Sequence, residues 1–91
     1  MSNNEKTMHW IFLHPCKELN DYIQGRITGI IYVLIGMPDI CWAWMRRRDG
    51  VEYMRFECTD EQYQTILNAI DKDYGRLIER GFVVFVKNKE E

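Results

Sequence analysis

The segment CWAWMRRRDGVEYMRFEC, residues 41–58, places an Asp-Gly pair between two stretches that are rich in aromatic and apolar residues. Asp49-Gly50 is typical of a two-residue type I′ turn, in which both residues take positive φ angles. The segment therefore predicts a β-hairpin in which Arg48 pairs with Val51.

Because side chains alternate across a strand, this pairing divides the hairpin into two faces. The first face is apolar and holds Cys41, Ala43, Met45, Met54, Phe56 and Cys58. The second mixes aromatic and cationic groups with a valine and a glutamate, and it holds Trp42, Trp44, Arg46, Arg48, Val51, Tyr53, Arg55 and Glu57. We expect the first face in the core and the second exposed, since helices cover only one face of a single sheet. The reverse assignment, with the tryptophans in the core, is the alternative.

On the C-terminal side, residues 59–80 predict a helix. Thr59 can cap it, and Gln62 stands where a capping box requires Glu or Gln. Apolar residues recur at helical spacing, namely Tyr63, Ile66, Leu67, Ile70, Tyr74, Leu77 and Ile78. Gly81 suits the position after a helix end, and FVVFVK (82–87) predicts a further strand.

On the N-terminal side, MHWIFLH (8–14) predicts a strand and residues 17–25 a short helix. The next segment, RITGIIYVLIG (26–36), is ambiguous. Its β-branched residues favour a buried strand, which we expect because Gly25 and Gly29 would weaken a helix interior. Continuation of the helix is the alternative.

Both alternatives give a single two-layer α+β domain, with an antiparallel sheet of four to five strands and two helices on one face. A strand at 26–36 gives a helix-covered meander, whereas a helix gives the ferredoxin-like order βαββαβ. The domain is expected to span 8–87, between a flexible arm (1–7) and a solvated tail (88–91).

Composition restricts the classes of partner and ligand. Twelve basic and 14 acidic residues give a net charge of −2, so the chain as a whole is not a basic nucleic-acid binder. Three cysteines without a CxxC spacing do not predict a zinc site, and no cofactor or metal is expected. The longest apolar run, 27–37, is shorter than the roughly 20 residues of a membrane span. We expect a reduced, cytoplasmic protein.

Two chemical alternatives involve the LHPC stretch. His14 and Cys16 could form a nucleophile pair, but no flanking signature supports catalysis. His9, His14 and Cys16 together do not make a four-ligand metal set. Ordinary structural roles are the expected ones.

The sequence therefore predicts a non-catalytic protein–protein interaction module. Trp, Tyr and Arg are enriched at binding hot spots. The predicted contact residues are those of the second face, Trp42, Trp44, Arg46, Arg48, Tyr53 and Arg55. The expected partner is a protein with an acidic patch, contacted by a small adaptor or inhibitor of the kind that phages and mobile elements encode. Single-stranded nucleic acid on the same face is the alternative, and an edge strand or the aromatic face could also join two copies in a homodimer.

Overall fold

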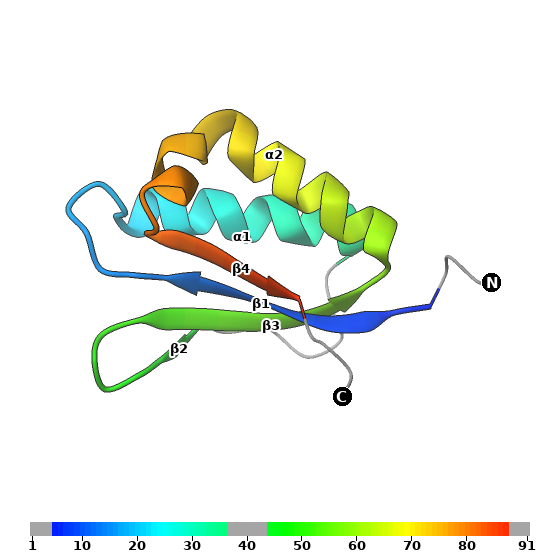
Figure 1. Cartoon of the computed structure of the whole chain (residues 1–91), viewed down its shortest axis with the longest axis horizontal. Coiled ribbons are helices and arrows are strands. Elements are labelled where there is room, and N and C mark those ends of the chain that lie inside the picture. The colour runs from blue at the N-terminus through cyan, green and yellow to red at the C-terminus, as the bar shows by residue number, and fades with distance from the viewer. Residues whose placement is uncertain (1–4, 37–43, 88–91) are drawn as a thin grey trace.

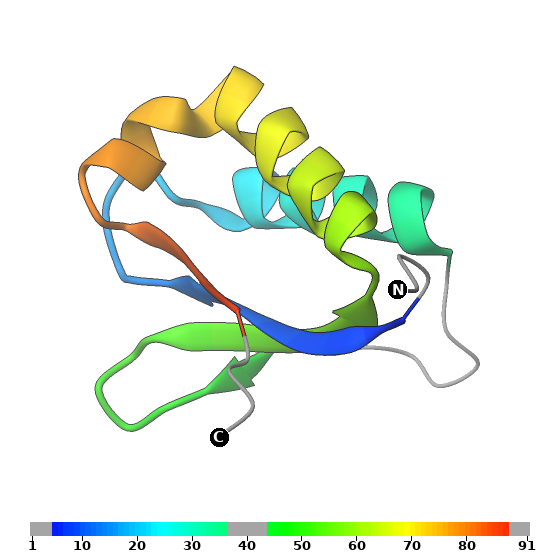
Figure 2. The same cartoon turned by 45° about the vertical axis from the view of Figure 1, so that its right-hand side comes forward.

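The computed structural model describes residues 5–36 and 44–87, which form an antiparallel sheet with two helices on one side (Figures 1 and 2). In chain order the elements are β1 (Thr7–Leu13), α1 (Asp21–Ile35), β2 (Met45–Arg46), β3 (Glu52–Cys58), α2 (Asp60–Glu79) and β4 (Val83–Lys87). The four strands of the described residues lie in the order β2-β3-β1-β4. The predicted two-layer α+β fold is confirmed in its ferredoxin-like form. The predicted tail (88–91) and the first four residues of the predicted arm lie outside the described residues.

The strand favoured at 26–36 was a wrong prediction, because this segment continues α1. Ile27 and Ile31, four residues apart, are both fully buried against the sheet. A Cβ atom added at Gly25 or Gly29 would meet nothing within 4 Å, so both glycines lie away from the core. Burial of one isoleucine-rich face outweighs the poor helix propensity of the two glycines.

Local signals fix where α1 begins and ends. The Asn20 side chain accepts a hydrogen bond of 3.1 Å from the Ile23 amide and caps the first turn. The helix ends at Gly36, whose φ of 84° is one that glycine adopts at little cost. These boundaries make α1 a single 15-residue helix instead of a short helix followed by a strand.

Helix α2 begins with the predicted capping box. The Gln62 amide donates to the Thr59 hydroxyl at 3.1 Å, and the Gln62 side chain accepts from the Thr59 amide at 2.9 Å. Ile66, Ile70 and Leu77 point from this helix into the core. The sequence prediction of this helix is confirmed.

The hairpin is present, but its turn is one residue longer than predicted. The Gly50 amide donates to the Arg47 carbonyl at 3.0 Å, and the Arg47 amide donates to the Val51 carbonyl at 2.8 Å. Arg48, Asp49 and Gly50 therefore form a three-residue loop. Gly50 has a φ of 90°, whereas no described residue other than glycine has a positive φ. The turn is thus the bulged type, with glycine alone in the left-handed region.

The longer turn shifts the pairing of β2 against β3. Met45 lies opposite Tyr53 and Arg46 opposite Glu52, whereas the sequence predicted Met54 and Tyr53 as their partners. A shift of one residue moves every side chain of one strand to the other face. The two predicted faces of the hairpin are therefore wrong: Met45 shares a face with Tyr53 and not with Met54.

The core lies between the sheet and the helices. Alternate residues of the two central strands point into it, and these are His9, Ile11 and Leu13 of β1 with Met54, Phe56 and Cys58 of β3. From β4, Val83 is also buried. The remaining alternate residues of these strands must point to the opposite side of the sheet.

Candidate protein-interaction surface

The sheet face opposite the helices is covered by no described helix or strand. We call it the outer sheet face. Cross-strand pairing and alternation place on it Met8, Trp10, Phe12, Met45, Tyr53, Arg55, Glu57, Val84 and Val86. Most of these side chains are apolar, although a sheet face turned to water is commonly polar.

One row of apolar side chains crosses all four strands. Met45 lies opposite Tyr53, Tyr53 opposite Phe12, and Phe12 opposite Val84. The rings of Phe12 and Tyr53 have centroids 5.6 Å apart in a tilted arrangement. The guanidinium carbon of Arg47 lies 5.9 Å from the Phe12 ring centroid, so a cation also borders this row.

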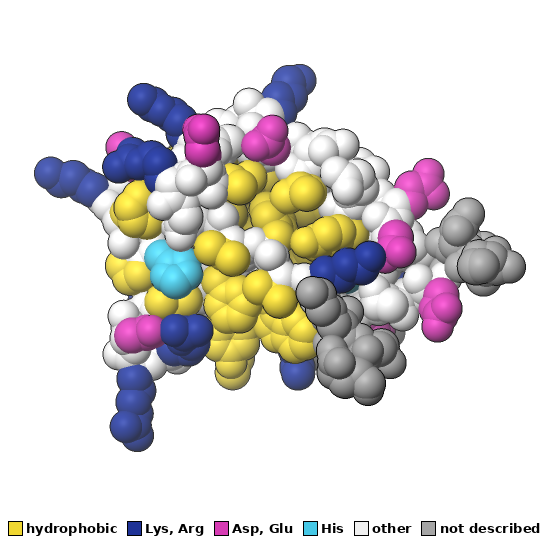
Figure 3. Space-filling model, viewed as in Figure 1, with side chains coloured by type: hydrophobic (Ala, Val, Ile, Leu, Met, Phe, Trp, Pro, Cys, Tyr) yellow, Lys and Arg dark blue, Asp and Glu magenta, His cyan; other side chains and the backbone are white. Residues whose placement is uncertain are grey.

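A second row contains a cation between apolar neighbours. Trp10 lies between Arg55 of β3 and Val86 of β4. Val86 is 40% exposed, and Met45 in the first row is 55% exposed. Arg55 makes no ion pair with another described residue. Figure 3 shows hydrophobic side chains gathered in the middle of one view of the molecule, with most lysine and arginine side chains toward its periphery.

Comparisons of the chain with protein-family models, with curated proteins and with solved structures find no match. Its function has therefore to be inferred from its own surfaces.

The structure does not place Trp44 where the sequence predicted. Its indole packs against the core, and its Nε1 donates a hydrogen bond of 2.8 Å to the Thr28 hydroxyl of α1. Trp44 therefore lies on the helix side of the sheet, because the longer turn reverses its expected direction. Trp42, the other tryptophan among the predicted contact residues, lies outside the described residues.

The predicted arginines are also divided between locations. Arg46 lies on the helix side, where its guanidinium bonds the Glu52 carboxylate at 2.8 Å, and Gln24 of α1 donates to the other Glu52 oxygen at 2.7 Å. Arg48 is exposed at the turn. Of the six predicted contact residues, Tyr53 and Arg55 are thus placed on the outer sheet face.

The sequence reasoning missed the aromatic residues that β1 contributes. Trp10 and Phe12 alternate with Ile11 and Leu13, so both faces of this strand are apolar. An apolar strand of this kind is typical of one that is covered on both sides. Only the position of both helices on one side shows that no described helix or strand covers Trp10 and Phe12 on the other.

Away from this surface, burial shifts the pKa values of two titratable groups near the start of α2, His9 and Cys58. His9 is fully buried and stacks on Tyr63 with ring centroids 4.2 Å apart, and its Nε2 lies 2.9 Å from the Thr7 hydroxyl. Burial, and secondarily the charge of Lys87, lowers the pKa of His9. Burial raises the pKa of the Cys58 thiol to about 11, so that thiol is protonated at neutral pH.

The LHPC residues (13–16) lie at the end of the sheet where the β2–β3 hairpin turns. His14 and Cys16 line a polar depression of about 240 Å³ together with Gln24 and Glu52. No hydrogen bond joins His14 to Cys16. Within residues 5–36 and 44–87, no group of three or more His, Cys, Asp or Glu side chains is arranged to hold a metal ion. Over the same ranges, neither helix is long and apolar enough to cross a membrane.

Proposed function

We propose that this chain is a non-catalytic protein–protein interaction module that binds its partner through the outer sheet face. One observation carries the proposal: apolar and aromatic side chains form continuous rows on a sheet face that no described element covers. The aromatic side chains of these rows are half-buried, and Met45 and Val86 near the two sheet edges are exposed. Apolar surface patches of this kind are typical of interaction sites. Within the cytoplasm, such a module would act as a small adaptor or as an inhibitor, of phage or mobile-element type, that occupies a larger assembly.

The residues of the face suggest a role for each row. Phe12, Tyr53 and Trp10 supply rigid aromatic area at the centre, where hot spots form. Met45 and Val86 extend this area toward the two edges of the sheet. Arg55 supplies a positive charge inside the patch, so we propose a partner surface that is apolar with an acidic group opposite Arg55.

The arginine run contributes less to this surface than its sequence suggested. Arg46 is neutralised by Glu52, and Arg47 bonds Asp49 at 2.6 Å. Arg48 lies at the hairpin turn, at one end of the face. We therefore propose that Arg48 assists the encounter with an acidic partner, while the apolar rows supply most of the affinity.

The test is capture of a partner from host lysate by the wild type and by two folded variants, each with and without nuclease. One variant, Met45→Asp/Val86→Asp, charges exposed positions on the outer sheet face. The matched control, Tyr22→Asp/Val33→Asp, charges exposed apolar positions on α1. We expect a nuclease-resistant partner on the wild type and the control but not on the face variant. The purified partner should then bind the face variant at least about tenfold more weakly.

Loss of capture in the α1 control alone would overturn the proposal, since the contact would then lie on the helix side. Equal capture by all three proteins would overturn it as well. Capture that disappears with nuclease would support the second candidate, single-stranded nucleic acid.

A specific observation favours that second candidate over the remaining ones. Trp10, Phe12, Tyr53 and Arg55 share a sheet face that no described helix or strand covers. Bases stack on sheet aromatics in known RNA-binding folds. The net charge of −2 and the few cations of this face favour a protein partner instead. Binding of oligonucleotides that weakens steeply with salt would decide for nucleic acid.

A further inference from the structure

Strand β1, in the middle of the sheet, is apolar on both sides. Ile11 and Leu13 face the core. Trp10 and Phe12 alternate with them, face outward and are half-buried. A strand of this composition is typical of one that is covered on both sides, yet no described helix or strand covers the outward side. Apolar surface of this kind favours association, because association removes it from water.

The outer sheet face also carries one cation and one anion without partners. Arg55 and Glu57 lie two residues apart on β3, and both are exposed. Neither makes an ion pair with another described residue. A surface with one unpaired charge of each sign complements a second copy of itself when Arg55 of each copy lies near Glu57 of the other.

Two copies of this face overlap completely about either of two twofold axes. The strand order β2-β3-β1-β4 puts the middle of the sheet between β3 and β1. An axis there, parallel to the strands, places β3 of one copy over β1 of the other, and β2 over β4. An axis across the strands, at the row of Arg55 and Trp10, would set Arg55 against Arg55 of the other copy. Repulsion between these two cations favours the axis parallel to the strands.

We propose that two copies of this chain stack their outer sheet faces about the axis parallel to the strands. Each row then faces the same row of the other copy, with β3 over β1. From the register within the sheet, the contacts that occur twice are Tyr53 with Phe12, Met45 with Val84, and Arg55 with Trp10. The first two are apolar, and the third places a guanidinium on an indole ring. Glu57, one row further along β3, lies diagonally across from Arg55 of the other copy and gives that charge a partner.

The size of the face sets the strength of the dimer. Four strands about 4.8 Å apart are about 19 Å wide, and seven residues of a central strand are about 24 Å long. Allowing for the shorter edge strands, the flat outline of each face is about 400 Å², and side chains that stand up from the sheet enlarge it. Two copies thus bury a total near the roughly 1,000 Å² at which specific interfaces begin. We therefore expect a weak dimer that dissociates in the micromolar range.

The dimer would regulate access to the partner surface, and in this respect the inference rests on the proposed function. The same side chains cannot contact a second copy and a partner protein at once. A partner therefore has to compete with the second copy, and its apparent affinity falls as the fraction of free monomer falls. The contact between the two copies itself is measured without any partner.

The first test is sedimentation equilibrium of the full chain from about 5 to about 500 µM, the range in which a small interface dissociates. The wild type should shift from monomer to dimer over this range. Met45→Asp and Val84→Lys should each dimerise at least about tenfold more weakly, because each buries an unpaired charge against an apolar side chain. An equimolar mixture of the two variants should regain the dimer, since the two new charges face each other between copies. Within one copy positions 45 and 84 are about 14 Å apart, on opposite edges of the sheet, so they cannot pair there.

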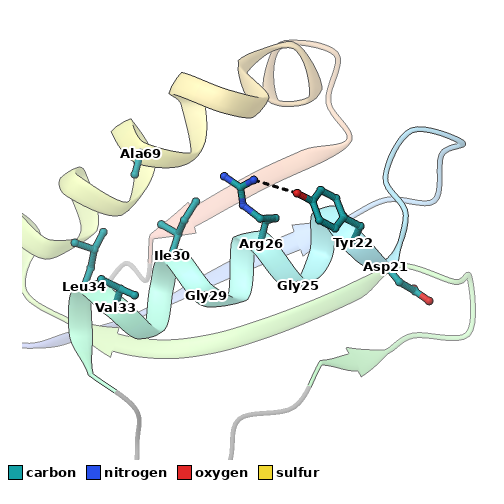
Figure 4. Close-up of a pocket in the computed structure, with 9 residues that line it drawn as sticks. All are labelled: Asp21, Tyr22, Gly25, Arg26, Gly29, Ile30, Val33, Leu34 and Ala69. Atoms are coloured by element: carbon teal, nitrogen blue, oxygen red, sulfur yellow. Dashed lines mark hydrogen bonds between the residues drawn. The ribbon is translucent and has the colours of Figure 1, made fainter.

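The matched control charges the other side of the molecule. Tyr22 and Val33 line a pocket of about 690 Å³ along α1 (Figure 4), and both are exposed. Tyr22→Asp/Val33→Asp should therefore dimerise like the wild type. A monomeric wild type, a mixture that stays monomeric, or a control that loses the dimer would each overturn the proposal.

The second test uses the wild type and does not depend on a variant that folds. In a dimer of differently labelled copies, we expect a nuclear Overhauser effect between the methyl groups of Met45 and Val84. The distance between these residues within one copy is too long for this signal, so it reports the contact between copies. A dimer without this signal would have another interface and would contradict the proposal.

Failure of this inference is distinguishable from failure of the proposed function. A wild type that stays monomeric but still captures a nuclease-resistant partner through the outer sheet face would remove the dimer alone. A wild type that dimerises as described, with equal capture by the wild type, the face variant and the α1 control, would remove the partner proposal alone.

Discussion

The side chain of Trp44 links the hairpin to α1, so its substitution should lower the stability of the domain. Its indole packs against the core and donates to the Thr28 hydroxyl. We expect Trp44→Phe to lower the free energy of unfolding by about 1 kcal/mol through loss of that hydrogen bond. Trp44→Ala should cost about 2–4 kcal/mol because it also removes buried ring area. Denaturant unfolding monitored by circular dichroism measures both values.

Tyr53 provides the matched comparison on the outer sheet face. Its ring contacts Phe12 but does not enter the core, so Tyr53→Ala should cost less than about 1.5 kcal/mol. A larger loss for Tyr53→Ala than for Trp44→Ala would contradict the placement of these residues on opposite faces.

His9 makes the stability of the domain depend on pH. Burial lowers its pKa below the ordinary value of 6.5, with Lys87 adding to this effect and Asp60 opposing it. The unfolded chain therefore binds a proton more readily than the folded one. As the pH falls below about 6.5, His9 of the unfolded chain takes up a proton before His9 of the folded chain does. The free energy of unfolding therefore decreases below that pH. Melting temperatures between about pH 7.5 and pH 5.5 should fall for the wild type.

The control for this prediction is His9→Gln, which keeps a polar side chain at the position but cannot titrate. Its melting temperature should change less over the same pH interval, although the variant is less stable overall. If the wild type and His9→Gln lost stability in parallel, another group would be responsible.

At the scale of elements, one substitution should have opposite effects in the turn and in α1. Gly50 has a φ of 90°, and a Cβ there would approach the Pro15 ring at 3.4 Å, so Gly50→Ala should destabilise the fold by about 1–2 kcal/mol. Gly29 has helical geometry and open space, so Gly29→Ala should stabilise the monomer by about 0.5–1 kcal/mol. Thermal unfolding at a low protein concentration measures both effects. A Gly29→Ala monomer less stable than the wild type would mean that α1 is packed more tightly there.

The sequence predicted those elements whose signals are local. The capping box and apolar spacing of α2 stand within 20 consecutive residues, and the structure confirms them. The prediction of a strand at 26–36 was wrong. The β-branched residues of this segment suit a strand, but a helix buries Ile27 and Ile31 against the sheet. Tertiary contacts, which a local pattern does not contain, made that choice.

The candidate surface was predicted less completely than the fold, for a related reason. An Asp-Gly pair predicts a hairpin but serves turns of two and of three residues. The difference of one residue moved Trp44 and Arg46 to the helix side. Trp10 and Phe12 were missed because an apolar strand does not reveal which of its faces the helices cover.

For the whole molecule, the sheet order separates two surfaces in space. The helices cover one side of the sheet (Figure 2), so the outer sheet face and the exposed surface of α1 lie on opposite sides of the domain. Substitutions on the two surfaces are far apart and share no partners, and their effects on stability should therefore add.

The same sheet order predicts which backbone amides exchange their hydrogens most slowly. Strand β1 pairs with β3 on one side and with β4 on the other, whereas β2 and β4 lie at the edges of the described sheet. Amides that exchange only on global unfolding concentrate in central, buried strands. We expect the slowest hydrogen exchange at Ile11 and Met54, which face the core from the two central strands, and faster exchange at Val86. Native-state exchange measured by NMR provides the comparison. If β4 amides were as protected as those of β1, the β4 edge would have to be covered in solution.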